Sequence, residues 1–352
     1  MKLRLLTVLA ALALTACGGG DGDDGQKSIH RFQVVSFGDS LSDVGTYQVD
    51  GLPPVGPARF DGGRYTTNPG AVWTQHVALY YRGELRPAVH GGFGQSETST
   101  GGLGYAQGGS RVEAALPAGS SGALGKPISG QIDSYLSRHG SFDPDQLVLL
   151  QGGSNDILNA VLASAQGAIS PESVPAVVSA AAVGMAQQVG RLTQAGASRV
   201  LLANIPDLGQ TPLAVARPAL AGTLTRMTLL FNATLADELK HQKLPPHFVL
   251  ADSYRWFAEV LSHYQSNGFR VSNTATACSV PLVIARARAI GLADPETFVR
   301  QNGTSLICSA ATLIEADADQ AYMFADEVHP STRMHALYAQ FIEREIDGGA
   351  IN

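Results

Sequence analysis

Charged residues are scarce in this sequence, and they form no basic stretch. Lys, Arg, Asp and Glu together make up 15% of the 352 residues, the formal net charge is −6, and no run of Lys or Arg is longer than a pair. Proteins that bind nucleic acid usually carry a basic patch that neutralises phosphate groups. We therefore expect no nucleic-acid partner. Hydrophobic residues make up 45% of the chain, which indicates a folded protein with a substantial core.

The N-terminal region contains an apolar stretch at residues 5–14 that is too short to cross a bilayer. It follows two basic residues and has the form of the apolar part of a secretory signal peptide. The tetrapeptide LTAC at 14–17 resembles a bacterial lipobox, in which cleavage precedes a cysteine that carries lipid. We expect residues 1–16 to be a lipoprotein signal peptide and Cys17 to be lipidated. The alternative is an ordinary signal peptide beside an incidental cysteine.

A glycine- and aspartate-rich segment follows Cys17: GGGDGDDG at 18–25 has no side chain to bury. Such a composition is typical of a flexible tether. We therefore predict the lipidated cysteine and tether at 17–29 and a single domain at 30–352. Several acyl chains on one cysteine would hold the protein stably at a membrane of the bacterial cell envelope. The domain itself is expected to be a monomer.

Cysteine occurs only three times, and the sequence contains neither Cys-x-x-Cys nor His-Glu-x-x-His. The sequence thus gives no indication of a thiol redox motif or of a zinc protease site. If Cys17 carries lipid, Cys278 and Cys308 are the pair that remains. In an exported protein such a pair usually forms a disulfide, and we predict one here. Two buried free thiols are the alternative.

Short apolar runs and longer amphipathic segments alternate through the chain. The apolar runs predict strands at 32–36, 147–150, 199–203 and 248–251. Helices are predicted at 69–81 with Asn68 as the N-cap, at 128–138, from 170 to about 196 with Ser170 as the cap, at 225–241, at 254–264 and at about 332–346. Residues 91–109 and 265–320 are expected to be mostly irregular. This alternation favours a parallel sheet that is covered by helices on both faces.

Two loops that follow predicted strands carry reactive side chains. The loop FGDSLSD at 37–43 contains Ser40, which can be held rigidly with its hydroxyl exposed. A helix N-cap is the alternative role for this serine. The loop QGGSND at 151–156 contains Asn155, whose amide can donate to a developing oxyanion. The alternative there is an Asx turn that enters a helix, and Asp156 is expected to support the loop.

A third loop, ADEVHPS at 325–331, precedes the last predicted helix and contains His329. A histidine that acts as a general base needs a carboxylate to fix its tautomer. Among the nine histidines, only His241 and His329 have an acidic residue three positions earlier. His241 and Glu238 lie within a predicted amphipathic helix, where an exposed ion pair is the ordinary explanation. His329, with Asp326, is therefore the better base, and His335 is expected at the surface.

Together these segments resemble the GDSL (SGNH) hydrolase family. FGDSLSDVG at 37–45 is similar to its serine block, GGSND at 152–156 to its Gly-x-Asn-Asp block, and DEVHP at 326–330 to its Asp-x-x-His block. GGRYTTNPGAVW at 62–73 is similar to a segment of the branch with bacterial lipases, autotransporter esterases and lecithinase-like phospholipases. The resemblance implies a three-layer α/β/α sandwich with a mainly parallel central sheet, of the flavodoxin-like SGNH type.

The resemblance also implies a mechanism. Ser40 would attack an ester carbonyl, His329 would take its proton, and Asp326 would orient the imidazole. The N–H groups of Ser40 and Gly109 and the amide of Asn155 would form the oxyanion hole. The family's glycine block often begins with asparagine, which is absent from GYAQGGS at 104–110, so Gly108 is the alternative donor. No metal or organic cofactor is implied.

The expected substrate is a small-molecule or lipid ester, phospholipids included, cleaved by a lipase or esterase. The α/β-hydrolase motif Gly-x-Ser-x-Gly occurs nowhere in the chain, which weighs against that competing fold. A carbohydrate O-deacetylase is the alternative enzyme. A surface lipoprotein that binds a ligand without catalysis is the alternative of another class.

Overall fold

The computed structural model describes residues 31–47, 62–116, 122–292 and 294–348. The predicted signal peptide, the lipidation site at Cys17 and the tether lie outside these described residues. No helix in the described ranges is both long enough and apolar enough to span a membrane.

The central sheet has four parallel strands in the order β1-β4-β5-β6. These strands are β1 (Gln33–Gly38), β4 (Gln146–Gln151), β5 (Arg199–Ala203) and β6 (His247–Ala251), so all four predicted strands are confirmed. A further extended segment runs beside β1, because Tyr105 N donates to Ser36 O at 2.8 Å and Ser36 N donates to Leu103 O at 3.1 Å. With this segment, the order along the sheet is the flavodoxin-like one.

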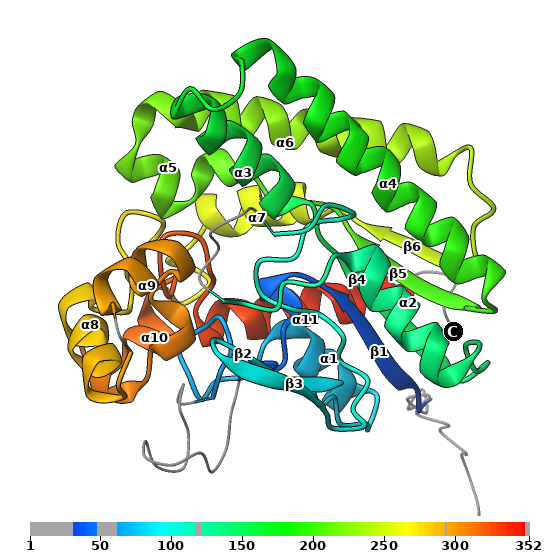
Figure 1. The fold of residues 1–352 in the computed structure, drawn as a ribbon, viewed down its shortest axis with the longest axis horizontal. Coiled ribbons are helices and arrows are strands. Elements are labelled where there is room, and N and C mark those ends of the chain that lie inside the picture. The colour runs from blue at the N-terminus through cyan, green and yellow to red at the C-terminus, as the bar shows by residue number, and fades with distance from the viewer. Residues whose placement is uncertain (1–30, 48–61, 117–121, 293, 349–352) are drawn as a thin grey trace, which may run out of the picture. The chain divides into compact units, whose positions relative to one another are not determined.

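Helices cover both faces of this sheet (Figure 1). Val148 and Leu150 of β4 are buried in the core on one face, and Leu147 and Leu149 are buried in the core on the other. The first face packs against α2 (Ile128–His139), α3 (Ser154–Ala165), α4 (Val174–Gln194) and α6 (Pro218–Leu239), and the second against α1 (Trp73–Tyr80) and α11 (Thr332–Gly348). Burial on both faces is why β1, β4 and β5 contain continuous apolar runs, whereas β6 ends the strand order and is only partly buried. The predicted three-layer α/β/α sandwich is confirmed.

The remaining elements connect these layers or extend beyond the edge of the sheet. They are η1 (Ser40–Ser42), β2 (Val89–Gly92), β3 (Gln95–Ser99), η2 (Pro171–Ser173), η3 (Leu208–Gln210), α5 (Pro212–Ala216), α7 (Ser253–Ser262), α8 (Val280–Ala289), α9 (Pro295–Asn302), η4 (Ser305–Ile307), η5 (Ala310–Thr312) and α10 (Ala318–Ala321). The expectation of irregular structure was therefore wrong for about half of 265–320, where α8 and α9 lie, and 91–109 contributes to an antiparallel hairpin of β2 and β3.

Three predicted helix starts were also wrong, and for the helix predicted at 225–241 the observed α6 begins earlier, at Pro218. The first helix begins at Trp73, because the Asn68 side chain does not cap a helix but donates to the carbonyls of Arg64 and Ser305 at 2.8 and 2.9 Å. The Ser170 side chain forms no cap hydrogen bond, and a short 3-10 turn precedes α4.

Cys278 and Cys308 form the predicted disulfide, which lies in a separate apolar cluster under α8 and α9. Both cysteines are buried, and Phe298 and Leu306 are among their apolar neighbours. The disulfide therefore ties the start of α8 to the segment that follows η4.

Candidate active site

Ser40, His329 and Asp326 form a continuous hydrogen-bonded row. His329 Nε2 lies 2.9 Å from Ser40 Oγ, and His329 Nδ1 lies 2.8 and 2.9 Å from the two carboxylate oxygens of Asp326. All three side chains are buried. A row of this kind can move a proton from a serine hydroxyl to an imidazole that a carboxylate stabilises.

The Asp326 carboxylate is held in its charged form. Burial alone would raise its pKa, but the nearby His329 charge and several hydrogen bonds outweigh burial and hold the pKa well below its usual range. The N–H groups of Val328 and His329 donate to Oδ1 at 3.0 and 2.8 Å, and the N–H of Ser305 donates to Oδ2 at 3.0 Å. A carboxylate that is fixed and ionised can orient the imidazole and stabilise its protonated form.

Ser40 is placed by the end of β1. Gly38, the last residue of this strand, exchanges two hydrogen bonds with the Gln131 side chain of α2, at 2.9 and 2.8 Å. Gly38 has a φ of +157°, and a Cβ there would overlap Gln151 O, so this position requires glycine. Asp39 caps the short helix η1, because its Oδ1 accepts the N–H of Leu41 at 3.1 Å. The chain thus turns sharply at the carboxyl end of the sheet and presents Ser40.

The structure distinguishes between the two candidate oxyanion glycines. The N–H of Gly108 donates to Asp43 Oδ2 at 2.9 Å, so it is engaged in the fold. No hydrogen bond within the described ranges uses the N–H of Gly109 or of Ser40. Gly109 also has a φ of +84°, which favours glycine, and both glycines line the same cavity as Ser40. The two glycines thus differ in that the N–H of Gly108 is engaged by Asp43.

Asn155 and Asp156 lie in the first turn of α3 and hold the glycine loop. Asn155 Nδ2 donates to Ser110 O at 2.9 Å, and Asp156 Oδ2 accepts the N–H of Val112 at 3.0 Å. Burial raises the pKa of Asp156 to about 6, although the Val112 hydrogen bond opposes this. Asp156 thus supports the glycine loop, as expected. Asn155 uses one amide hydrogen for Ser110 O and has a second one that could bind a ligand.

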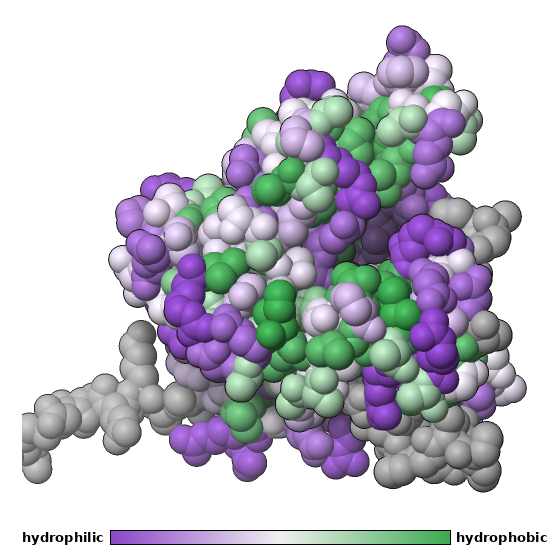
Figure 2. Space-filling model, turned by 90° about the vertical axis from the view of Figure 1, so that its left-hand side faces the viewer, coloured by the Kyte–Doolittle hydropathy of each residue, from purple (hydrophilic) through white to green (hydrophobic). Residues whose placement is uncertain are grey.

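A cavity of about 740 Å³ adjoins Ser40 and His329, and Gly109 and Asn155 also line it. Much of its wall is apolar, with contributions from Leu41, Leu158, Leu162, Leu208, Leu213, Phe257, Val280, Ile284, Val299, Phe324 and Met334. Val280 lines the cavity and is 48% exposed, so the cavity reaches the surface at the start of α8. Figure 2 views the side on which α5, α8 and α9 lie, and shows apolar side chains gathered among polar ones there. Within the described ranges, no group of three or more potential metal ligands is present.

Sequence reasoning missed two residues of the 62–73 segment that support the site. The Tyr65 ring packs against the His329 imidazole with their centroids 4.9 Å apart. Trp73 Nε1 donates to Ser42 Oγ at 3.2 Å, and Ser42 ends the short helix η1 that begins with Ser40. The resemblance of 62–73 to a family segment was the available signal, but it gave no role to either aromatic residue.

The expectation of a surface position for His335 was wrong. His335 is 2% exposed, and its Nδ1 accepts the N–H of Trp73 at 3.3 Å. Burial lowers its pKa to about 3, so the ring is neutral. The missed signal is its spacing from Tyr338, Ala339 and Ile342, which are all buried on the face of α11 that packs on the sheet.

Comparison with known proteins agrees with this geometry. Residues 34–342 match the model of the GDSL-like lipase/acylhydrolase family. A phosphatidylcholine-sterol acyltransferase of Aeromonas hydrophila is 26% identical over 369 aligned residues, which cover 99% of each chain. An uncharacterized protein in the trpE-trpG intergenic region of Pseudomonas putida is 32% identical over 119 residues, or 33% of this chain and 18% of that protein. Because the family model spans most of the chain and includes every residue of the hydrogen-bonded row, this protein belongs to the GDSL-like lipase/acylhydrolase family.

Proposed function

We propose that this protein cleaves carboxylic esters of lipid-like substrates through an acyl-enzyme on Ser40. The family supports ester hydrolysis or acyl transfer in general. The observation that carries the proposal is the His329 imidazole, which bonds to Ser40 Oγ on one side and to Asp326 on the other beside a largely apolar cavity.

In the proposed reaction, Ser40 Oγ forms a bond to the ester carbonyl carbon while its proton passes to His329 Nε2. The C–O bond of the ester then breaks, and the alcohol leaves with that proton. A water molecule attacks the acyl carbon and loses a proton to His329; the bond from Ser40 Oγ to the acyl carbon then breaks, Oγ takes that proton back from His329, and the acid leaves. The N–H groups of Ser40 and Gly109 and the amide of Asn155 stabilise the two oxyanion intermediates.

The cavity wall favours an acyl chain over a sugar as the group that lies next to Ser40. Leu158, Leu208 and Leu213 line the cavity, and burying alkyl groups against such side chains is favourable. A carbohydrate O-deacetylase needs polar groups along the wall for the sugar hydroxyls, and Asn159, Asp207 and Arg217 do line the cavity, but apolar atoms make up the larger part of its wall. We therefore favour lipase or esterase activity, phospholipid esters included, over sugar deacetylation.

Acyl transfer to an alcohol is a second candidate function. The relative from Aeromonas hydrophila, which aligns over 99% of its length, carries the name of an acyltransferase. The same acyl-enzyme would serve both reactions, because an alcohol can replace the water that attacks the acyl carbon. The two reactions differ only in which hydroxyl reaches Ser40 and His329.

Turnover of p-nitrophenyl esters from acetyl to palmitoyl by the domain at 30–352 tests this function. We expect hydrolysis, with kcat/KM higher for longer chains than for acetate. Adding an alcohol and looking for its ester distinguishes transfer from hydrolysis. Failure to cleave any of these esters would favour a binding lipoprotein, and cleavage of acetylated sugars alone would favour the deacetylase.

We also propose that Cys17 anchors the protein to a membrane of the bacterial cell envelope. The support is the lipobox-like tetrapeptide at 14–17 and the glycine-rich segment that follows it. An anchor would hold the domain close to its lipid substrates.

A further inference from the structure

We propose that Ser305 is a positioning residue for Asp326 and His329, an inference that rests on the proposed ester hydrolysis. Ser305 is fully buried and is not among the residues that line the cavity. Its N–H donates to Asp326 Oδ2 at 3.0 Å, and its Oγ lies 3.1 Å from His329 Nδ1. Ser305 thus contacts both partners of Ser40 without reaching the substrate.

The tautomer of His329 decides how the Ser305 hydroxyl acts. For Nε2 to accept the Ser40 proton, the neutral ring must carry its own proton on Nδ1. A protonated Nδ1 accepts no hydrogen bond, so Ser305 Oγ presents a lone pair to it. The Ser305 hydroxyl proton is then available to the Asp326 carboxylate, whose Oδ2 already accepts the Ser305 N–H. Ser305 therefore bridges the carboxylate and the imidazole and favours the tautomer that the reaction needs.

The carboxylate of Asp326 is held from several directions. Ser305 binds Oδ2, while the N–H groups of Val328 and His329 bind Oδ1. Gly303 lies directly against Oδ2, and a Cβ at that position would overlap it. Ser305 contacts the carboxylate from another segment of the chain, whereas Val328 and His329 belong to the same loop as Asp326.

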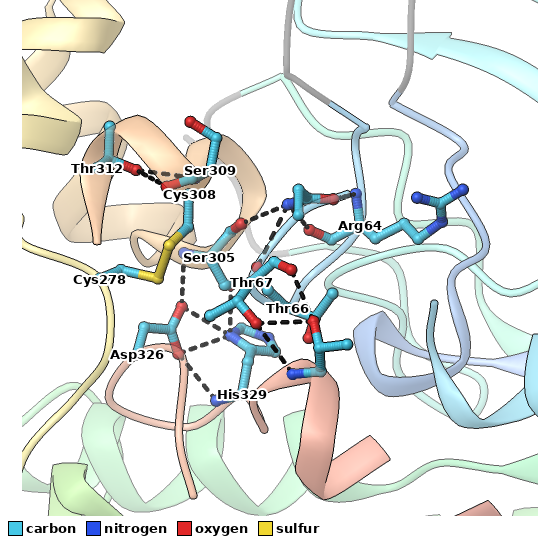
Figure 3. Close-up of a disulfide and its surroundings, with 12 residues drawn as sticks. Arg64, Thr66, Thr67, Cys278, Ser305, Cys308, Ser309, Thr312, Asp326 and His329 are labelled. Atoms are coloured by element: carbon cyan, nitrogen blue, oxygen red, sulfur yellow. Dashed lines mark hydrogen bonds and ion pairs between the residues drawn. A yellow bond between two sulfur atoms is a disulfide. The ribbon is translucent and has the colours of Figure 1, made fainter. Parts of the chain in front are cut away.

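Ser305 is itself fixed by two distant parts of the chain. It begins η4, and Cys308, directly after η4, is joined to Cys278. Asn68 Nδ2 donates to Ser305 O at 2.9 Å, and Asn68 N donates to Cys308 O at 3.1 Å. Figure 3 shows the disulfide, Ser305, Asp326 and His329 side by side. This anchoring gives the Ser305 hydroxyl a defined position.

Ser305→Ala tests the role, because it removes the hydroxyl, keeps the N–H and leaves little extra space. Losing a hydrogen bond to a charged group costs enough free energy to lower kcat about tenfold. KM should stay unchanged, because Ser305 does not contact the substrate. Ser305→Thr restores a hydroxyl and should recover part of kcat. Ser309→Ala is the control: Ser309 follows Cys308 in the same segment, and its side chain belongs to the η5 cap.

The NMR resonance of the His329 Nδ1 proton gives a readout that does not depend on turnover. We expect it to shift in Ser305→Ala and not in Ser309→Ala. A kcat for Ser305→Ala within about twofold of wild type, an equal loss in Ser309→Ala, or an unmoved Nδ1 resonance overturns the proposal. If the wild-type protein cleaves no ester, the proposed hydrolysis fails instead, and the NMR comparison still tests the position of Ser305.

Discussion

Asn155 uses one amide hydrogen for the Ser110 carbonyl and has a second one available, and it lines the same cavity as Ser40. Asn155→Ala should therefore lower kcat by about 10² to 10³, the usual cost of losing one oxyanion donor. KM should change little, because the ground-state carbonyl uses this donor less than the oxyanion does. Steady-state kinetics on p-nitrophenyl butyrate measure both values. A loss confined to KM would assign Asn155 to substrate binding instead.

Asp39 has a buried charge that the fold does not compensate. Its Oδ2 has no hydrogen-bond partner within the described ranges, and burial raises its pKa to about 6 from a model-compound value of 3.8. Because the pKa of Asp39 is higher in the folded than in the unfolded protein, the contribution of Asp39 to the free energy of unfolding is most favourable at low pH. That contribution is lost as the pH rises from about 4 through 6.

Asp39→Asn should remove this pH dependence, because the amide carries no charge and can keep the acceptor for Leu41. The free energy of unfolding of Asp39→Asn minus that of wild type should rise with pH. This difference should be about 2 kcal/mol larger at pH 8 than at pH 4.5. Urea unfolding of both proteins at the two pH values gives this difference. An equal effect at both values would show that Asp39 is not protonated in the fold at low pH.

The sequence indicated those site residues whose roles can be recognised from their near neighbours in the chain. Ser40 follows a strand, and Asp326 precedes His329 by three positions, so both features were visible in short segments. Ser305 and Tyr65 were not visible, because they reach His329 from positions 24 and 264 residues away in the chain. Such contacts depend on how loops pack, which neither composition nor periodicity encodes.

At the scale of elements, β1, β4 and β5 were predicted well because their central residues are buried on both faces and are therefore apolar, and β6 was recognised by its apolar residues although it is only partly buried. Helices α8 and α9 were missed for different reasons. Val280 and Leu282 of α8 are exposed apolar residues, which blurs the 3.6-residue periodicity. For α9 a usable signal was present, since Asp294 caps the helix and Pro295 is its first residue.

The disulfide should stabilise this helical segment and the loop that carries Ser305. It links residues 30 positions apart, and in the chain-entropy model such a link is worth about 3 to 4 kcal/mol. Replacing Cys278 and Cys308 together with Ala should lower the free energy of unfolding by about that amount. Denaturant unfolding measures it, and titration of the denatured, unreduced domain should find no free thiol from this pair. Two reactive thiols in the wild-type domain would contradict the disulfide.

At the scale of the whole molecule, the proposed anchor places an apolar-lined cavity near a membrane. Cys17→Ala should leave the protein without lipid, so that it partitions into the aqueous phase of a Triton X-114 extraction while wild type partitions into the detergent phase. The variant should keep its turnover of soluble esters, because Cys17 lies outside the catalytic segments. Equal partitioning of both proteins into detergent would show that another feature attaches the chain.

The covalent reaction of the intact chain with a fluorophosphonate tests the central claim most directly, because only an activated serine reacts. Intact-mass spectrometry should find one adduct on the wild-type domain, and peptide mapping should place it on Ser40. Asn155→Ala should react more slowly, while Ser40→Ala should gain no adduct and cleave no ester. A Ser40→Ala protein that is labelled and still turns over p-nitrophenyl butyrate would contradict the account, because the nucleophile would then be another serine.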